Sequence, residues 1–402
     1  MTGLAYCDRQ GRIYFDESQT PLADGGDLHE AAPDELIPAP PGSVEVILPG
    51  RRALTARGTK RGQYAMAAVL PAGYTRLLVP AFEKESGAPA LPLFGYTFAC
   101  VVDDELYVAA MKTDESEDWQ PRYFEEGELE AILDRRIARD PLNRVLAQVA
   151  LCSREYGCFT AQNVFLERGE AALPVSPKCN ARCIGCISEQ EPEAELDSPQ
   201  ARIAYETSAE ELARIGVHHL ERVDDGIVSF GQGCEGEPLL RSLSIASAIE
   251  KIRAARGNGT INLNTNGSMP SALERCIDTG LQAVRISLNS FRPDVYAAYY
   301  RPIGYSLDQV LESIRLACER GLRVSLNLLT HPGVTDDEEE VRAMTEFLSA
   351  VRVTMIQTRT LNIDPDWYFA AVGRPRNPVG MRRAIEAMRQ AHVSVGNFTH
   401  TH

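Results

Sequence analysis

The chain has 402 residues, of which 44% are hydrophobic and 24% charged, a composition that excludes disorder over most of its length. Its formal net charge of −15 opposes non-specific binding to nucleic acid or to anionic membranes, since both carry negative charge. No apolar run approaches the ~18 residues of a membrane-spanning helix, and the first residues lack the features of a secretory signal. Its ten cysteines therefore indicate a reducing compartment, and we expect a cytoplasmic protein.

Residues 1–165 predict a smaller, β-rich α+β domain. Short strands are expected at 11–15, 43–48, 63–70, 74–79, 93–102 and 105–111, and a loop rich in Pro, Gly and Asp at about 20–42. The last two of these strands predict a hairpin. Two helices are expected to close the domain, one over about 125–138 and one that opens at Asp140 with Pro141 in its first turn.

Residues 166–402 predict a second domain in which strands and helices alternate. Strands are expected at 171–175, 226–231, 260–264, 282–288, 322–329 and 352–359. Six β–α units in succession imply a parallel sheet, either an open doubly wound sheet or a partial barrel. In both architectures the active site lies at the carboxyl ends of the strands. Ser208 with Glu211, and Thr335 with Glu338, predict capping boxes at two helix starts.

The strongest motif is a cysteine triplet just after the first strand of this series. The segment PVSPKCNARCIGCIS holds Cys179, Cys183 and Cys186 in the pattern C-x3-C-x2-C. Three closely spaced thiolates can hold three irons of one [4Fe–4S] cube, which leaves the fourth iron open to a small molecule. A zinc site would normally need four protein ligands, and no fourth Cys or His follows at a matching spacing. Three unrelated thiols, and a zinc site with a distant fourth ligand, are the alternatives.

The triplet resembles the signature of the radical SAM superfamily, and the resemblance covers about residues 171–395. It implies a partial (β/α)6 TIM-like barrel in which the unique iron of the [4Fe–4S] cluster binds S-adenosylmethionine. It also implies that one electron cleaves the sulfonium bond to give a 5′-deoxyadenosyl radical, which abstracts a substrate hydrogen. One position departs from the pattern, because the residue that is usually aromatic and lies against the adenine is Gly185. Only backbone contacts with the cofactor are expected there.

The second strand ends in SFGQGCEGEPLL, which looks like the superfamily's GGE motif. The matching residues are Gly236 and Glu237, followed by Pro238, and the resemblance implies that they meet the methionine amino group. Glycine allows a close backbone approach and a carboxylate can pair with an ammonium group. The third strand runs into NLNTNG, where Asn266 matches a TNG motif of the superfamily. A glycine-rich turn with a solvated Glu, and a plain strand-to-helix turn, are the alternatives.

Polar residues also end the fourth and sixth strands. Ser287 and Asn289 resemble groups that contact the ribose hydroxyls or the methionine carboxylate, for which hydroxyl and amide side chains are suitable. Gln357 and Arg359 share one face of the sixth strand, since side chains alternate along a strand. If that face is the barrel interior, we expect both to contact the cofactor, with Arg359 holding a carboxylate. A structural ion pair is the alternative for Arg359.

Two further residues are candidates for catalysis. Cys234 lies inside the GGE-like segment and His331 follows the fifth strand directly. A small buried thiol and a loop histidine are the alternatives. Cys152 and Cys158 could hold an auxiliary cluster with one of the cysteines of the first domain, or be ordinary buried thiols.

These motifs predict a radical SAM enzyme with a [4Fe–4S] cluster and S-adenosylmethionine, acting on a small molecule or a peptide. A non-enzymatic iron–sulfur electron carrier or scaffold, and a zinc-binding interaction protein, are the alternatives. The resemblance implies flavodoxin or ferredoxin as the electron donor. The acidic charge disfavours nucleic acid as a partner. The first domain is expected to recognise the substrate or to cover the open side of the barrel.

Overall fold

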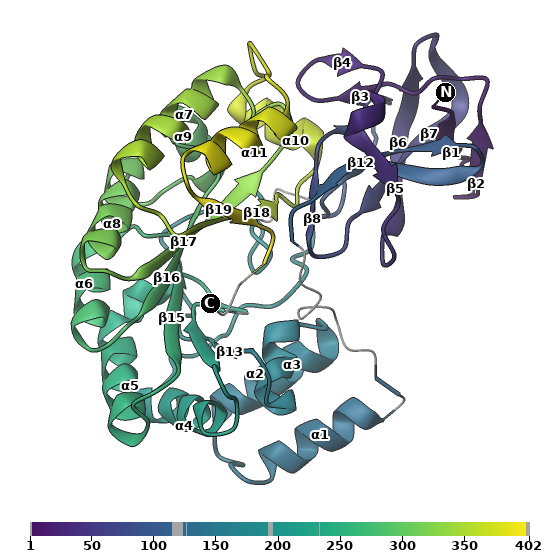
Figure 1. Cartoon of the computed structure of the whole chain (residues 1–402). Helices are drawn as coiled ribbons and strands as arrows, with labels where there is room; N and C mark the ends of the chain where they lie inside the picture. Colours follow the sequence, from purple (N-terminus) through teal and green to yellow (C-terminus); the bar gives the residue numbers. More distant parts are fainter. Residues whose placement is uncertain (1, 115–123, 126, 192–195, 233, 399–402) are drawn as a thin grey trace.

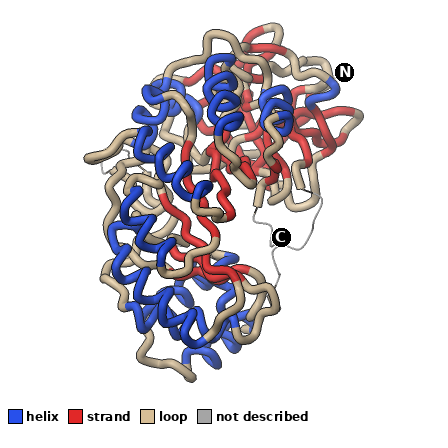
Figure 2. Tube along the Cα trace, turned by 60° about the vertical axis from the view of Figure 1, so that its left-hand side comes forward, coloured by secondary structure: helices blue, strands red, loops and turns tan. Residues whose placement is uncertain are grey.

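The computed structural model describes residues 2–114, 124–125, 127–191, 196–232 and 234–398. It is a mixed α/β structure in which an antiparallel sheet near the amino terminus meets a parallel sheet lined by helices (Figure 1). Figure 2 shows, from a direction turned by 60°, that helices gather on one side of the parallel strands. No helix among the described residues is long and apolar enough to cross a membrane.

The amino-terminal strands form a nine-stranded antiparallel sheet. Its main path runs β10 (Phe82–Lys84), β6 (Val44–Thr55), β7 (Gly58–Val69), β11 (Thr97–Val102), β12 (Glu105–Lys112) and β5 (Leu36–Pro38). Strands β1 (Leu4–Cys7), β2 (Ile13–Asp16) and β8 (Tyr74–Arg76) join this path from its sides. A separate three-stranded sheet contains β4 (Leu28–His29), β3 (Ala23–Asp24) and β9 (Val79–Pro80). The expected hairpin is present as β11 and β12.

The expected loop at 20–42 is wrong in part. Strands β3, β4 and β5 and a 3₁₀ turn at Pro33–Glu35 lie within it. These strands have two or three residues each, which is too short to show the alternation by which a sequence reveals a strand. They form because distant strands supply their partners, β9 for β3 and β12 for β5.

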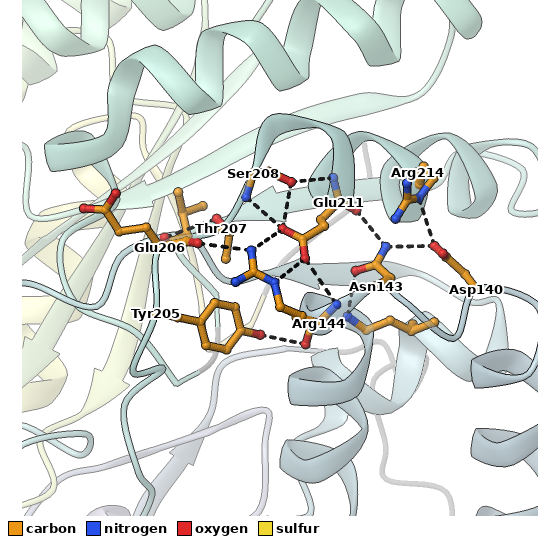
Figure 3. Close-up of polar contacts among 11 residues, drawn as sticks. Asp140, Asn143, Arg144, Tyr205, Glu206, Thr207, Ser208, Glu211 and Arg214 are labelled. Carbon is orange, nitrogen blue, oxygen red and sulfur yellow. Dashed lines mark hydrogen bonds and ion pairs between the residues drawn. The ribbon is translucent and has the colours of Figure 1, made fainter.

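Three helices, α1 (Glu128–Ile137), α2 (Arg144–Glu155) and α3 (Phe159–Leu166), follow the antiparallel sheet. The expected start of the second helix at Asp140 is wrong, because Asn143 is the N-cap of α2 and its Oδ1 accepts the Leu146 amide at 3.1 Å. The Asp140 carboxylate instead accepts hydrogen bonds from the side chains of Asn143 and Arg214 (Figure 3). Helix α3 has no counterpart among the predicted helices.

An ion pair joins α2 to helix α4 (Ala209–Leu220), the first helix after the parallel sheet begins. Arg144 Nε and Nη2 donate to the two oxygens of Glu211 at 2.8 and 2.9 Å (Figure 3). The predicted capping box is present, because Ser208 Oγ accepts the Glu211 amide and Glu211 Oε2 accepts the Ser208 amide. Helices α2 and α3 also share one hydrophobic core with the parallel strands. The predicted domain boundary at residue 165 therefore stays a prediction.

Seven parallel strands follow one another in sequence order. They are β13 (Glu170–Leu173), β14 (Ile227–Phe230), β15 (Thr260–Thr265), β16 (Ala283–Leu288), β17 (Arg323–Thr330), β18 (Met355–Thr360) and β19 (Ser394–Gly396). The helices between them, besides α4, are α5 (Ser242–Ala255), α6 (Pro270–Asp278), α7 (Pro293–Tyr300), α8 (Leu307–Glu319), α9 (Glu338–Ala350), α10 (Pro365–Val372) and α11 (Met381–Gln390). Figure 1 shows the sheet curving inside these helices. Each expected strand overlaps one of β13 to β18, whereas β19 was not expected.

The second expected capping box is wrong. Asp337 is the N-cap of α9, and its carboxylate accepts the Glu339 amide at 3.1 Å. Thr335 Oγ1 instead accepts the amide of His331 at 2.9 Å, within the turn that precedes the helix. Asp is as good an N-cap residue as Thr, so the local geometry of this turn decides between them.

The antiparallel sheet is fastened to the carboxyl ends of β17 and β18. The buried Arg76 guanidinium donates to the carbonyls of Thr330 and Leu361 at 3.3 and 3.0 Å. The buried Arg51 pairs with the buried carboxylate of Asp364, which precedes α10. The amino-terminal sheet is thus held next to the edge of the parallel sheet at which an active site is expected.

Candidate active site

The cysteine triplet lies on the loop that follows β13. Cys179, Cys183 and Cys186 are half-buried, and all three line one cavity of about 810 Å³. The loop is held from one side by α7, since the Ile184 amide donates to the Tyr299 carbonyl at 3.1 Å. Burial raises the pKa of Cys179 to about 11 and the pKa of Cys183 well above its ordinary value. Burial therefore favours the protonated thiols of Cys179 and Cys183.

The GGE-like segment lies directly against this loop. The amides of Gly236 and Glu237 donate to the carbonyls of Ser176 and Lys178, each at 2.8 Å. A Cβ atom on Gly236 would lie 2.1 Å from the Lys178 carbonyl oxygen, so only glycine permits this approach. Gly236, Glu237 and Pro238 all line the cavity. The segment and the cysteine loop thus form one wall.

The Glu237 carboxylate accepts hydrogen bonds from neighbouring groups of the protein. It accepts the amides of Leu239 and Asn266 at 2.9 and 2.8 Å and the Thr265 hydroxyl at 2.5 Å. Burial raises its pKa to about 7. These bonds tie the GGE-like segment to the end of β15. The expected contact between Glu237 and a methionine amino group stays a prediction.

Glu235 was missed by sequence reasoning. Its Oε2 accepts the amides of Val175 and Ser176 at 2.9 and 3.0 Å, which fixes the start of the cysteine loop. Its Oε1 is buried without a hydrogen-bond partner in the described part of the chain, and the residue lines the cavity. Burial raises the pKa of Glu235 to about 8. The only signal in the sequence is a second acidic residue within the glycine-rich segment.

The structure explains why glycine occupies position 185. A Cβ atom on Gly185 would lie 2.9 Å from Tyr299 Oη and 3.1 Å from the Asn362 carbonyl oxygen. The space that an aromatic side chain would need there is therefore taken by Tyr299, which comes from α7. Tyr299 lines the same cavity.

The expected polar residues at the strand ends separate into two groups. Asn266, Ser287 and Arg359 line the cavity. Asn289 is fully buried, and its side-chain amide donates to a tyrosine hydroxyl of α10 at 3.1 Å. Gln357 lines a separate cavity of about 400 Å³ near the amino ends of the strands. Asn289 and Gln357 are therefore not part of the wall around the cysteines.

Arg359 faces the cavity without a carboxylate partner in the described part of the chain. Its Nη1 donates to the Asn397 carbonyl at 2.8 Å. Burial and the charge of Arg285 lower the pKa of Arg359, and the attraction of Glu170 and Asp114 opposes this shift only in part. The structural ion pair that was the alternative for this residue is thus not found among the described residues.

Neither catalytic candidate lines the cavity. Cys234 is fully buried, with its Sγ 2.8 Å from Cys152 Sγ. His331 is fully buried beside Tyr368 and Phe369, with ring centroids 4.8 and 5.0 Å apart. Burial holds the pKa of His331 well below its ordinary value. Both positions favour the alternatives of a buried thiol and a packed histidine.

Known proteins resemble the part of the chain that carries this site. Residues 173–345 match the family model for the radical SAM superfamily. A GTP 3′,8-cyclase from Pelotomaculum thermopropionicum is 28% identical over 208 residues, which cover 50% of this chain and 58% of that protein. A GTP 3′,8-cyclase from Thermodesulfovibrio yellowstonii is 32% identical over 174 residues, which cover 43% and 50%. The chain spans about half the length of the curated relatives it matches.

Two solved structures with partial similarity are a radical SAM methyltransferase from Sphaerobacter thermophilus and Streptococcus suis SuiB bound to its precursor peptide SuiA. Both have a TM-score of 0.40, with sequence identities of 16% and 13%. The methyltransferase match covers 56% of this chain and 64% of the other, and the SuiB match covers 63% and 52%. Proteins of the matched superfamily use a [4Fe–4S] cluster and S-adenosylmethionine. The match to the radical SAM superfamily covers residues 173–345, which include the cysteine triplet and the GGE-like segment.

Proposed function

We propose that this chain is an enzyme that cleaves S-adenosylmethionine reductively at a [4Fe–4S] cluster and abstracts hydrogen from a small-molecule or peptide substrate. The observation that carries the proposal is the cavity of about 810 Å³, which is lined both by the three cysteines and by the GGE-like segment. Its volume lies within the range of about 300–1,000 Å³ that is common for small-molecule sites. A simple electron carrier or a structural zinc protein needs no such cavity beside its cysteines.

Cys179, Cys183 and Cys186 would hold three irons of the cluster and leave the fourth iron to S-adenosylmethionine. Among the described residues, no three potential ligands are arranged around a single metal ion, as the ligands of a zinc site are. Thiolates that bind three different irons of a cube do not need to converge on one point. Arg202, whose Nη2 lies 3.8 Å from Cys186 Sγ, would offset part of the negative charge of the cluster.

Glu235 is the best-placed carboxylate for the ammonium group of S-adenosylmethionine. Glu235 lines the cavity, and its Oε1 is buried without a hydrogen-bond partner among the described residues. Both oxygens of Glu237, by contrast, accept hydrogen bonds from the protein. Asn266 and Ser287 line the same cavity and offer amide and hydroxyl groups to the remaining polar atoms of the cofactor. Glu237 would act by positioning the segment that carries Glu235.

Tyr299 would supply the aromatic surface that Gly185 does not. It occupies the space that a side chain at position 185 would need, and it lines the cavity. An aromatic ring stacked on a purine contributes about 1–3 kcal/mol per base when nucleic-acid complexes are tested by substitution. We therefore expect Tyr299→Leu to weaken the binding of S-adenosylmethionine about tenfold and Tyr299→Phe to preserve it.

We propose further that the curved parallel sheet is the partial (β/α)6 TIM-like barrel of the superfamily, with β19 as an extra strand. The amino-terminal sheet would cover its open side, since Val69, Leu70 and Gly95 of that region line the cavity. Flavodoxin or ferredoxin would serve as the electron donor. The curated relatives are named for GTP, but the match covers about half of their length and therefore supports the cofactors rather than that substrate.

Anaerobic reconstitution with iron and sulfide tests this function. We expect the chain to take up one [4Fe–4S] cluster and to release 5′-deoxyadenosine from S-adenosylmethionine when reduced. Cys183→Ala should lose the cluster, whereas Cys276→Ala, a buried cysteine of α6 that does not line the cavity, should keep it. Stoichiometric zinc without cleavage of S-adenosylmethionine, or equal iron loss in both variants, would overturn the proposal.

A variant of Glu235 tests whether this carboxylate, rather than Glu237, binds the ammonium group. Glu235→Gln should weaken the binding of S-adenosylmethionine by tenfold or more, since it removes a charged partner of the ammonium group but keeps the shape of the side chain. Calorimetric titration of the reconstituted protein measures this affinity. Unchanged affinity in Glu235→Gln, with the iron content intact, contradicts the assignment.

A further inference from the structure

Two neighbouring side chains on β17 and β18 have hydrogen-bonding atoms without partners among the residues that the structure describes. Both amide atoms of Gln357 are buried and unpartnered, and the residue is only 1% exposed. Asn327 Oδ1 is also buried and unpartnered. Asn327 is the direct partner of Gln357 in the register of the two strands, so these atoms are neighbours.

Arg359 lies on the same face of β18 as Gln357, because side chains two residues apart on a strand point to the same side. The one hydrogen bond of its guanidinium group among the described residues is donated to the Asn397 carbonyl. A guanidinium group carries five N–H donors in a planar fork that fits a carboxylate or a phosphate. This cation therefore has donors left for an anion that the described chain does not supply.

These residues lie between two separate cavities, one at each end of the sheet interior. Arg359 and Asn327 line the cavity of about 810 Å³ that also contains the cysteines. Gln357 lines the cavity of about 400 Å³ nearer the amino ends of the strands. Buried polar atoms without partners raise the free energy of the free protein, and a ligand with matching atoms would remove that cost.

We propose that the substrate is a small polar molecule whose anionic group, a carboxylate or a phosphate, pairs with Arg359. A second group of the same molecule, an amide, hydroxyl or amine, bonds to Gln357 and Asn327 inside the sheet. This inference rests on the proposed function, which places the reacting centre in the cavity that Arg359 lines. It selects a small anionic molecule over a peptide, because the unmet atoms lie within the sheet rather than along its rim.

Titration of the reconstituted protein with succinamate, which carries a carboxylate and an amide, and with inorganic phosphate tests the anion site. We expect at least one probe to bind, and Arg359→Gln to weaken it tenfold or more. Arg253→Gln is the control, because this arginine is half-buried on α5, donates to backbone carbonyls and lines neither cavity. Binding of succinamate alone indicates a carboxylate substrate, and binding of phosphate alone indicates a phosphate ester. If neither probe binds, or if both variants weaken binding equally, the inference is wrong.

Gln357→Met tests the second contact without relying on turnover. Succinamate should bind more tightly than butyrate, which lacks the amide, and Gln357→Met should abolish this preference. The same variant should raise the melting temperature of the free protein by about 1–3 °C, because it removes two buried polar atoms that lack partners. A lower melting temperature together with an unchanged preference for succinamate would show that Gln357 has a structural role only.

Iron content and affinity for S-adenosylmethionine, measured in the same samples, separate the two proposals. If the cluster and the cofactor bind but neither probe does, the substrate inference fails and the proposed function stands. If no cluster assembles but a probe binds in an Arg359-dependent way, the proposed function fails and the anion site stands.

Discussion

The inner face of the parallel sheet has two halves that differ in how their charged side chains are paired. On β13 to β16, Glu170 accepts hydrogen bonds from Ser229, Gln232 and Arg285, and Asn262 donates to Ser229. Glu170 and Arg285 are both buried and form a direct ion pair. In this half the two charges pair with each other, although Asn262 Oδ1 is buried without a partner among the described residues.

On β17 and β18 some atoms of the corresponding polar groups lack hydrogen-bond or ion-pair partners in the described part of the chain. Arg359 has no carboxylate among the described residues, and Gln357 and Asn327 keep unpartnered atoms. Glu170, Arg285 and Gln357 are buried, whereas Asn327 and Arg359 are half-buried. The clearest difference lies in the charges, because Arg285 is paired with Glu170 whereas Arg359 forms no ion pair with a described carboxylate. A buried polar group without a partner lowers stability unless a ligand supplies one.

The largest effect should come from breaking the ion pair in the first of these halves. Arg285→Met leaves the Glu170 carboxylate buried without its counter-charge, which typically costs about 3–5 kcal/mol in the free energy of unfolding. Denaturant unfolding measures this loss. Arg285→Met combined with Glu170→Leu should recover most of it, because no unpaired charge is then left. A single variant within about 1 kcal/mol of the wild type would mean that the ion pair does not stabilise this half.

Acid should weaken the same half. Burial alone would raise the pKa of Glu170, but the charge of Arg285 and the hydrogen bonds from Arg285, Ser229 and Gln232 outweigh it and hold the pKa below the ordinary value of 4.5. The unfolded chain then binds the proton more readily, so stability is present above about pH 4.5 and is lost as the pH falls through the lowered pKa. Between pH 5 and pH 3, Glu170→Gln should lose less unfolding free energy than the wild type does. The difference should be about the contribution of one carboxylate with a lowered pKa. If the unfolding free energy of both proteins changes equally with pH, Glu170 does not contribute to the loss of stability in acid.

Sequence reasoning predicted the parallel sheet well because each of β13 to β18 carries an apolar run and ends at a turn signal. It missed β19 and β5, whose three residues show no periodicity and depend on partners distant in the chain. The cysteine spacing predicted the position of the triplet, which follows from the local chain alone.

The remainder of the site depends on how segments approach one another. Ser287 and Asn289 have the same place in the alternation of side chains, yet Ser287 lines the cavity and Asn289 is bonded to α10. Tyr299 reaches the cavity because Gly185, far away in sequence, leaves room for it. Glu235 and Glu237 differ only in which neighbours surround their carboxylates. A single sequence does not show which distant segments of the chain come into contact.

The partly exposed ion pair between Arg144 and Glu211 provides a comparison for the buried pair between Arg285 and Glu170. Arg144 and Glu211 bond through two atoms each, and hydrogen bonds from Arg144 lead the contacts that lower the pKa of Glu211 to about 2. The Arg144 side chain is 55% exposed, so solvent screens the pair and we expect Arg144→Ala to cost about 1 kcal/mol of unfolding free energy. Arg214→Ala, which removes a single contact with Asp140, should cost less. Losses in Arg144→Ala as large as in Arg285→Met would contradict the role given to burial.

The smallest change in stability should follow from altering Arg359 in the half formed by β17 and β18. Arg359→Gln removes one hydrogen bond to the Asn397 carbonyl, but it also removes a half-buried cation whose charge is disfavoured by desolvation and that forms no ion pair with a described carboxylate. These two effects oppose each other, so the free energy of unfolding should stay within about 1 kcal/mol of the wild type. Denaturant unfolding of Arg359→Gln beside Arg285→Met makes the comparison directly, since both remove an arginine from the inner face of the same sheet. Equal losses would mean that Arg359 stabilises the fold as Arg285 does. A near-neutral Arg359→Gln that nevertheless fails to bind the anionic probes would separate binding from stability on adjoining strands.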